Sequence, residues 1–382
     1  MVQIQRPVRA FSGGQKYTHT FENEMNDEGF LQKKELKMRA LKAQKALRAW
    51  YLSNCRPLPW RETPSLYGTW LSEVMLQQTR VETGIPKWHA FLKAFPTVQD
   101  LALASDDEVM KAWEGLGYYR RAKLLHKAAQ RIHEAGAFPS NHDEWLTLPG
   151  IGPYTAAAIS SIGMEEPVVA VDGNVQRVAA RWEGISFAVD TSAGDKAVRE
   201  VAEAWLDRSH PGDHNQAVME LGALVCTPKN AQCCSCPIAS TCKSAGNEKI
   251  WSTLPAKKPK KPPQAWTLQW QIVTWNSEVV VTQNPEHGIW SGLYVFPELR
   301  PGSSFAEIGS MFDPVTHILT HKRIDAHFIL WHAPNREALK EYSKLVNGEV
   351  LGWGDFGERP RPRLLTKMWD ELLRSTGNEE LH

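Results

Sequence analysis

The chain has 382 residues, a length that favours two or three domains over a single hydrophobic core. Its hydrophobic content (42%) and its charged content (23%) are typical of globular proteins. No apolar run approaches the roughly 18 residues that a membrane-spanning helix needs. A membrane protein and a wholly disordered chain are therefore disfavoured, and the net charge of +1 identifies no class of partner.

The first residues of the chain do not resemble a secretory signal, because the segment 1–20 lacks an apolar centre. Its basic residues are unopposed by acids, as in an organelle transit peptide, but the segment is poor in Ser and shows no amphipathic period. We therefore expect residues 1–34 to form a disordered extension. The alternative is that the start codon has been assigned too early and that translation begins at Met25 or Met38.

Helical periodicity dominates the region 35–225. Leu36, Ala40 and Leu47 recur at the spacing of one helix face. Further along, Ser105 precedes three acidic residues, a pattern typical of the start of a helix. We predict an all-α domain over this region.

Five of the six cysteines lie in the short segment 226–245. Four of them have the spacing C-x6-C-x2-C-x5-C: Cys226, Cys233, Cys236 and Cys242. Four thiolates on one loop suit a tetrahedral zinc ion or an iron–sulfur cluster, because both need soft ligands that converge on one point. A disulfide framework is disfavoured in a long chain without a secretory signal. The spacing does not choose between the two metals, and we take Cys234 as a spectator.

The segment 246–265 is rich in Lys and Pro, with four lysines and no acid between Leu254 and Pro263. We expect a solvated linker that can also lie along a phosphate backbone. After it the pattern changes to short β-rich stretches separated by turn signals. These stretches are residues 266–275, 278–283 and 327–332. They predict a smaller α/β or mainly β domain over 266–375.

A Gly-x-Gly turn follows an apolar helix that we expect to end at Leu148. Gly150 and Gly152 let the backbone pass close to a ligand, and Pro153 stands in the first turn of the next helix. The free N–H groups of that turn can bind a phosphate oxygen. Glycine turns between helices are common, so the flanking pattern L-P-G-x-G-x-x-T-A carries more weight than the turn itself.

One carboxylate is placed within an apolar helix. Glu73 shares a helix face with Trp70 and Gln77, so it can point into a cleft walled by Trp70. Desolvation beside an aromatic ring raises the pKa of a carboxyl group and makes it a usable general acid near neutral pH. The alternative is an ordinary glutamate exposed to water.

A second carboxylate, Asp172, follows an apolar extended run and precedes a helical rhythm, which is an N-cap position. A pure cap is the simpler interpretation, and it is compatible with catalysis. Backbone N–H bonds lower the pKa of a capping carboxyl group and keep it ionised. One carboxyl group with a raised pKa and one with a lowered pKa suit glycoside cleavage. This reaction needs an acid to protonate the leaving group and an anion to stabilise the sugar cation.

These segments together closely resemble the adenine DNA glycosylase family, MutY. The resemblance rests on the residues 58–79, 115–129, 148–159 and 171–178 and on the four-cysteine loop. It runs from about Leu47 to Cys242 and resumes in the C-terminal region. It implies an all-α helix-hairpin-helix glycosylase domain over 35–225, a [4Fe-4S] cluster loop over 226–245 and an α/β, MutT-like (Nudix-like) domain over 266–375.

The resemblance implies a monomeric, cytoplasmic base excision repair enzyme that flips adenine out of an A:8-oxoguanine or A:G mispair in double-stranded DNA and hydrolyses its N-glycosidic bond. Glu73 matches the acid that protonates adenine N7, and Asp172 matches the aspartate that stabilises the sugar cation. Asn174 and Tyr154 match residues placed around the flipped nucleotide and the two carboxyl groups. Gln78 matches the wedge that fills the base stack. The wall of the adenine pocket is matched by Arg56, Trp60 and Arg61.

The C-terminal domain is implied to recognise 8-oxoguanine. A family turn that is commonly Phe-Ser-His is matched here by Leu319, Thr320 and His321. Thr keeps the hydroxyl group, whereas Leu removes a stacking face. Pyrophosphatases related to this domain need an Arg-Glu-x-x-Glu-Glu run, but only Glu307 and Asp313 are acidic between residues 299 and 322. We therefore predict no pyrophosphatase activity.

Two other classes of protein share part of this pattern. A glycosylase/lyase like endonuclease III has the hairpin and the cysteine loop, but it needs a lysine nucleophile at the position of Tyr154. A phenol cannot form the Schiff base. A non-catalytic lesion-binding protein would keep the hairpin and the cluster without needing both Glu73 and Asp172.

Overall fold

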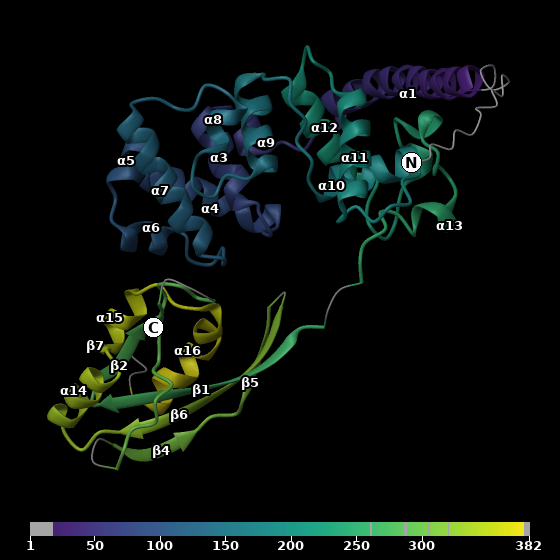
Figure 1. The fold of residues 1–382 in the computed structure, drawn as a ribbon. Coiled ribbons are helices and arrows are strands. Elements are labelled where there is room, and N and C mark those ends of the chain that lie inside the picture. Colours follow the sequence, from purple (N-terminus) through teal and green to yellow (C-terminus); the bar gives the residue numbers. More distant parts are fainter. Residues whose placement is uncertain (1–17, 260–261, 286–288, 304–305, 320, 378–382) are drawn as a thin grey trace, which may run out of the picture. The chain divides into compact units, whose positions relative to one another are not determined.

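The computed structural model describes residues 18–259, 262–285, 289–303, 306–319 and 321–377, with side chains from residue 34 onward (Figure 1). The chain divides into two compact units. The first unit comprises 1–56 and 165–258, and the second comprises 57–164 and 259–382. The helical domain expected over 35–225 is thus divided between the two units. None of the helices in the described ranges is long and apolar enough to cross a membrane.

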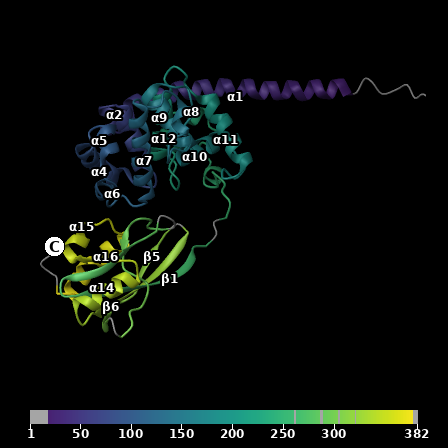
Figure 2. The same cartoon turned by 60° about the vertical axis from the view of Figure 1, so that its left-hand side comes forward.

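The first unit is helical, and the C-terminal part of a long N-terminal helix packs against it, while the rest of this helix projects beyond the other helices (Figures 1 and 2). Its α-helices are α1 (Thr18–Asn54), α10 (Gly173–Glu183), α11 (Ser192–Trp205), α12 (Pro211–Leu224) and α13 (Glu248–Trp251). Helix α1 packs against α11 and α12, and the rings of Trp182 and Trp205 meet in the core at 4.8 Å. The Cys-rich loop adds two 3-10 turns, η1 (Cys233–Ser235) and η2 (Ala239–Thr241).

Helix α1 differs from our expectation of a disordered extension over 1–34, because it begins at Thr18. Its sequence contains one Gly and no Pro, so few residues oppose the helix. Residues 1–17 lie outside the described part of the chain. The expected linker also contains structure, since α13 falls within 246–265.

The second unit contains a cluster of helices around a core rich in tryptophan. These helices are α2 (Pro59–Glu62), α3 (Leu66–Met75), α4 (Val81–Ala94), α5 (Val98–Leu103), α6 (Asp106–Ala112), α7 (Arg120–Ala135), α8 (His142–Leu146) and α9 (Pro153–Met164). Trp70, Trp113 and Trp145 are fully buried in the core. Ser105 caps α6 in a capping box with Glu108, which confirms the predicted helix start. Helix α8 ends at Leu146 and not at the expected Leu148.

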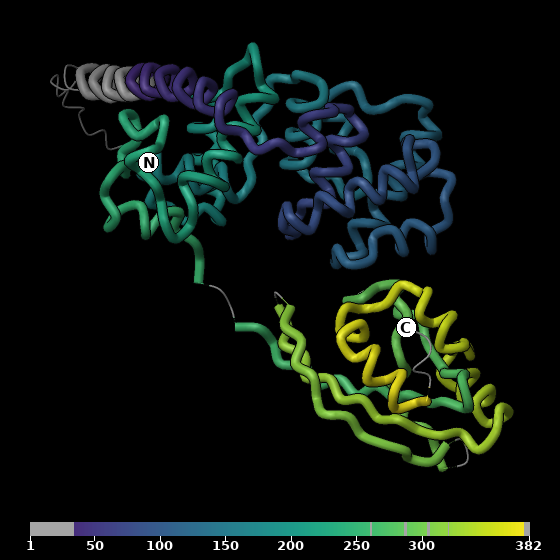
Figure 3. Tube along the Cα trace, turned by 180° about the vertical axis from the view of Figure 1, so that it is seen from behind, coloured from purple at the N-terminus to yellow at the C-terminus, as the bar shows by residue number. Residues whose placement is uncertain are grey.

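The C-terminal part of the second unit is a mixed sheet with helices. Its strands are β1 (Gln264–Trp275), β2 (Glu278–Gln283), β3 (Tyr294–Val295), β4 (Glu307–Met311), β5 (Val315–Ile318), β6 (Lys322–His332) and β7 (Glu349–Gly352). The main path of the sheet is β3-β2-β1-β6-β4, β5 pairs with β6, and β7 pairs with β2. Strands β1 and β6 run parallel and side by side (Figures 1 and 3). The three β-rich stretches predicted from the sequence are therefore confirmed as strands.

Helices cover both faces of this sheet. They are α14 (Arg336–Leu345), α15 (Trp353–Glu358) and α16 (Arg363–Ser375). Leu268 and Trp270 of β1 share a buried cluster with α15 and α16, whereas Val273 belongs to a second cluster with α14. The period-two alternation along β1 explains this division, because successive side chains point to opposite faces. The α/β character predicted for the C-terminal region is confirmed.

Candidate functional site

Glu73 and Tyr154 are brought together by two packed helices of the second unit, α3 and α9. The Tyr154 hydroxyl donates a hydrogen bond to Glu73 Oε2 at 2.8 Å. Both side chains are half-buried. A carboxylate in this setting is fixed in orientation but remains accessible, as a general acid must be.

Trp70 does not form the cleft wall that the helix spacing predicted. It is completely buried and packs against Tyr67, Phe138 and Trp145, with centroid distances of 6.2, 6.5 and 5.8 Å. The helix pattern placed Trp70 on the correct helix but could not show which neighbouring helices cover it. Trp70 therefore belongs to the core that supports α3.

The two glutamines after α3 have different surroundings. Gln77 Nε2 donates to Thr155 Oγ1 at 3.1 Å, which ties the end of α3 to the start of α9. Gln78 is exposed and has a φ of 59°. This left-handed backbone is uncommon for a residue other than glycine, so the loop is held in a specific shape.

The glycine turn has one crowded position and one open position. Gly150 has a φ of 79°, and a Cβ atom there would lie 2.7 Å from Leu124 Cβ. A Cβ atom at Gly152 would meet nothing within 4 Å. Gly150 is thus required by the packing of the turn, and the backbone at Gly152 is accessible to a ligand such as a phosphate.

Asp172 lies in the first unit at the N-terminus of α10, as predicted. Its Oδ1 accepts a hydrogen bond from the Val175 backbone N–H at 2.7 Å, and its Oδ2 accepts one from Asn174 Nδ2 at 2.7 Å. Arg177 Nη2 in turn donates to Asn174 Oδ1 at 2.8 Å. Asn174 is therefore held from both ends, and Asp172 is both a cap and an oriented carboxyl group.

The expected lowering of the Asp172 pKa is wrong. Burial raises the pKa of Asp172 above its ordinary value, and the hydrogen bonds from Val175 and Asn174 offset this only in part. The N-cap position was readable from the sequence, but the desolvation was not, because it comes from the packing of several segments.

The residues matched to an adenine pocket wall have different surroundings. Arg56 binds the buried Glu220 through Nε and Nη2 at 2.7 and 2.9 Å, and its backbone N–H also donates to Glu220. In the second unit Trp60 is buried against Trp88, and Arg61 is half-buried. The guanidinium group of Arg56 is thus already engaged in a structural ion pair.

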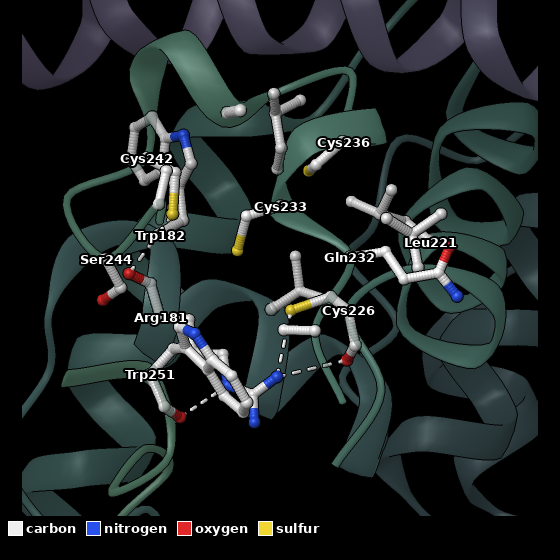
Figure 4. Close-up of a pocket in the computed structure, with 16 residues that line it drawn as sticks. Arg181, Trp182, Leu221, Cys226, Gln232, Cys233, Cys236, Cys242, Ser244 and Trp251 are labelled. Atoms are coloured by element: carbon white, nitrogen blue, oxygen red, sulfur yellow. Dashed lines mark hydrogen bonds between the residues drawn. The ribbon is translucent and has the colours of Figure 1, made fainter. Parts of the chain in front are cut away.

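The four predicted ligand cysteines line one cavity in the first unit, and their sulfur atoms surround a common space (Figure 4). Cys234 is exposed and is absent from the lining. In the described part of the chain no three His, Cys, Asp or Glu side chains are close enough to form a preassembled metal centre. The donor set nevertheless fits a thiolate-bound group, since four cysteine side chains face the space and no carboxylate lines it.

Arg181 of α10 joins this loop to the rest of the unit (Figure 4). It donates to Cys226 Sγ at 3.3 Å and to the Thr227 and Trp251 carbonyl groups at 2.8 and 2.9 Å. Burial raises the pKa of Cys236 to about 12 and that of Cys242 to about 11. The buried thiols therefore need a positive group to become thiolates.

The predicted lesion-sensing turn connects β5 to β6. The Leu319 backbone N–H donates to the Lys322 carbonyl at 2.8 Å, which closes the turn. Leu319 is half-buried against the core of the sheet, and His321 is exposed. Thr320 lies outside the described residues.

Sequence reasoning missed two residues that support the predicted site. Arg177 binds Asn174 from behind, and a Cβ atom at Gly222 of α12 would lie 2.6 Å from Asn174 Cβ. The position of Arg177, one helical turn after Asn174, was a usable signal. Gly222 gave no signal, because its role depends on the contact between α10 and α12.

Known DNA repair proteins are similar to this chain in sequence. Residues 71–208 match the HhH-GPD superfamily of base excision DNA repair proteins. The chain is 36% identical over 254 residues to the adenine DNA glycosylase of Buchnera aphidicola subsp. Schizaphis graminum, covering 65% of this chain and 72% of that protein. It is 33% identical over 309 residues to the human adenine DNA glycosylase, covering 66% of this chain and 57% of that protein.

The fold has a counterpart among solved structures. A thermostable thymine-DNA glycosylase superposes with a TM-score of 0.50 at 25% identity, covering 55% of this chain and 96% of that one. The match to a DNA repair superfamily and the extent of the identity lead to one conclusion. The chain belongs to the adenine DNA glycosylase family, a family of DNA N-glycosylases that act in base excision repair.

Proposed function

We propose that this chain is a monofunctional glycosylase that removes adenine mispaired with 8-oxoguanine, or with guanine, from duplex DNA. The observation that carries the proposal is the hydrogen bond from Tyr154 to Glu73. Tyr154 is the residue that matches the lyase lysine by resemblance, and its phenol cannot form a Schiff base. The bond also orients the one carboxyl group that α3 presents. The resemblance of Glu73 and Asp172 to the family's two carboxyl groups supports the same reaction.

Glu73 supplies the proton. In its protonated form it gives that proton to N7 of the extruded adenine, so that the C1′–N9 bond breaks and the base leaves neutral. Tyr154 holds the Oε2 atom of Glu73 and keeps the carboxyl group in one orientation. Water then adds to C1′ and loses a proton, which leaves an abasic sugar.

Asp172 stabilises the positive charge that develops on the sugar. Ionised Asp172 is held by Val175 and Asn174, so no side-chain reorganisation is needed when the charge develops. Its raised pKa follows from burial, and burial also strengthens its attraction to a sugar cation.

The four cavity cysteines would hold a [4Fe-4S] cluster, as relatives of this family do. Cys236 and Cys242 would bind the cluster as thiolates, since the positive charge of iron favours the deprotonated form of a buried thiol. Arg181 and the helix α10 would keep the cluster loop next to the segment that carries Asp172. This role is structural.

The C-terminal sheet would recognise 8-oxoguanine through the turn that contains Leu319 and His321. The described residues between β3 and β4 form no helix, and between Leu299 and Lys322 only Glu307 and Asp313 are acidic. This supports the absence of pyrophosphatase activity.

The test is the substitution Glu73→Gln, with Glu134→Gln on the exposed face of α7 as the control. We expect the first variant to release adenine about a hundredfold or more slowly than the parent while it still binds the duplex, because the amide cannot donate the proton. We expect the control to retain the parent rate. Adenine release by Glu73→Gln at the parent rate would show that another group is the acid.

A further inference from the structure

Arg121 of α7 is a buried cation without a carboxylate partner. Its exposed fraction is 9%, and none of the ion pairs among the described residues includes it. Its Nε atom has no hydrogen-bond partner among the residues that the structure describes, and burial lowers its pKa to about 10. A group that is expensive to bury in this way is retained only where its remaining donors have specific partners.

Those partners are the loop that follows α3. Arg121 Nη1 donates to the carbonyl groups of Val74, Met75 and Gln77 at 3.0, 2.9 and 2.6 Å. Val74 and Met75 end α3, so their carbonyl groups have no acceptor role within the helix. The guanidinium group therefore caps the C-terminus of α3, the helix that carries Glu73. It also binds the loop after α3 that contains Gln77, Gln78 and Thr79, called here the Gln78 loop.

The bonds of Arg121 lie on both sides of Gln78. Gln77 provides its carbonyl group before Gln78, and Thr79 provides its Oγ1 atom after it, at 3.2 Å from Nη2. Gln78 itself has a left-handed backbone with a φ of 59°. The anchoring of both neighbours by one rigid, planar group accounts for the persistence of this uncommon conformation.

The same guanidinium group binds a second loop. Nη2 donates to the Leu116 and Gly117 carbonyl groups, both at 3.0 Å. The next residue, Tyr118, has a φ of 48° and is 51% exposed, and its ring lies 5.6 Å from the guanidinium carbon of Arg121. Two loops with left-handed, exposed residues are thus held by one side chain.

We propose that Arg121 is a positioning residue that fixes the Gln78 loop and the Tyr118 loop in the shape needed to separate the target base from its stack. The inference rests on the proposed function, because it assigns Arg121 to the step before base release. Arg121 does not touch the reacting atoms and acts through Gln78. A lysine cannot replace Arg121. The guanidinium group has five donors in one plane and reaches both loops, whereas an ammonium group has three donors on a single atom.

The test compares Arg121→Lys with the parent and with Arg199→Lys, a control in which an exposed helical arginine keeps its charge. The rate of adenine release is measured under single turnover and divided by the concentration of active sites. Extrusion of the base is followed by 2-aminopurine fluorescence in the same duplex. We expect Arg121→Lys to lose about tenfold or more in rate per active site, with a matching loss of the fluorescence signal. We expect the control to be unchanged.

A merely structural role would lower the thermal midpoint and the number of active sites but leave the rate per active site at the parent value. That result would overturn the proposal. Combining Arg121→Lys with Gln78→Ala adds a second criterion, because residues that act as a unit have non-additive effects. Additive losses would also contradict the inference.

If Arg121→Lys does not fold, Thr79→Val removes the bond from Nη2 to Oγ1, together with the longer bond of 3.5 Å from that hydroxyl to the Gln77 carbonyl, and keeps the shape of the side chain. We expect a loss of about threefold or more in rate per active site for this variant, and the parent rate would overturn the proposal. If the parent chain itself does not release adenine, the proposed function is wrong. If the parent releases adenine and the variants do so at the same rate per active site, only the role of Arg121 is wrong.

Discussion

Asp172 shows how burial and hydrogen bonding compete at a single residue. Its bonds from Val175 and Asn174 favour the ionised form, but desolvation is the larger effect and raises its pKa. The protonated form is therefore stabilised by folding relative to an exposed aspartate. The charge that catalysis would use is held at a cost to stability, as is common at functional sites.

The substitution Asp172→Asn tests this conflict. Asn caps helices as well as Asp, so the N-cap is retained while the buried charge is removed. Because the folded pKa of Asp172 is raised, its stabilising effect is present at acidic pH and is lost as the pH rises through that pKa. We expect the variant to have a larger free energy of unfolding than the parent at pH 7.5, with the difference shrinking toward pH 4.

Urea unfolding at the two pH values measures this difference, with the exposed Asp195→Asn as the control. We also expect Asp172→Asn to lose adenine release by about a hundredfold or more. A variant less stable than the parent at pH 7.5 would mean that ionised Asp172 stabilises the fold.

Gly222 is a residue whose importance depends entirely on its contact with Asn174. A Cβ atom would lie 2.6 Å from Asn174 Cβ and 3.2 Å from its Cα, so Gly222→Ala must push α10 and α12 apart or displace Asn174. We expect a loss of about 1–3 kcal/mol in the free energy of unfolding and a slower release of adenine. The matched substitution Gly173→Ala meets no atom within 4 Å, so its free energy of unfolding should not fall. Equal stability of both alanine variants would contradict the packing argument.

At the scale of the elements, local signals predicted much of the structure. The Ser105 capping box, the strand 278–283 and the Pro153 helix start are set by residues that are neighbours in sequence. The burial of Trp70 and the raised pKa of Asp172 were not predictable, because each depends on helices that are distant in sequence. The pairing of Glu73 with Tyr154 was implied only by family resemblance, since periodicity cannot show which helices pack together.

The cysteine loop is the element for which we predict a dependence on a bound metal. Cys236→Ser replaces a thiol that lines the cavity by a hydroxyl group, whereas Cys234→Ser changes an exposed neighbour that does not line it. We expect the first variant to lose bound iron and to unfold at a lower temperature, and the second to retain both. Iron and zinc are measured on the purified proteins. Zinc without iron in the parent would favour a zinc site over an iron–sulfur cluster. Equal iron contents in the parent and in both serine variants would show that Cys236 is not a ligand.

At the scale of the whole molecule, the first unit is helical, and the second unit contains both helices and the α/β sheet. The residues assigned to the proposed activity are divided between these two units. Glu73, Tyr154 and Gln78 belong to the second unit, and Asp172 and the cysteines belong to the first. Neither unit contains both proposed catalytic carboxyl groups. We therefore expect the proposed activity only from a chain that contains both units.

The turn between β5 and β6 allows a prediction about substrate preference. Leu319 stands where the family commonly has Phe, and Phe would restore a ring that can stack on a base. We expect Leu319→Phe to increase the preference for A:8-oxoguanine over A:G by about threefold to tenfold, as measured from single-turnover rates on both duplexes. Leu299→Phe, at an exposed position outside this turn, serves as the control. An unchanged ratio for Leu319→Phe would place lesion recognition elsewhere.

The central claim is that the chain is a monofunctional adenine glycosylase. The most direct measurement is single-turnover cleavage of a duplex with adenine opposite 8-oxoguanine, beside duplexes with A:G, A:C and thymine glycol, scored with and without alkali. We expect release of adenine from the first two duplexes, with strand breaks only after alkali, because Tyr154 cannot form a Schiff base. Cleavage of the thymine glycol duplex without alkali, or binding without base release on every duplex, would contradict it.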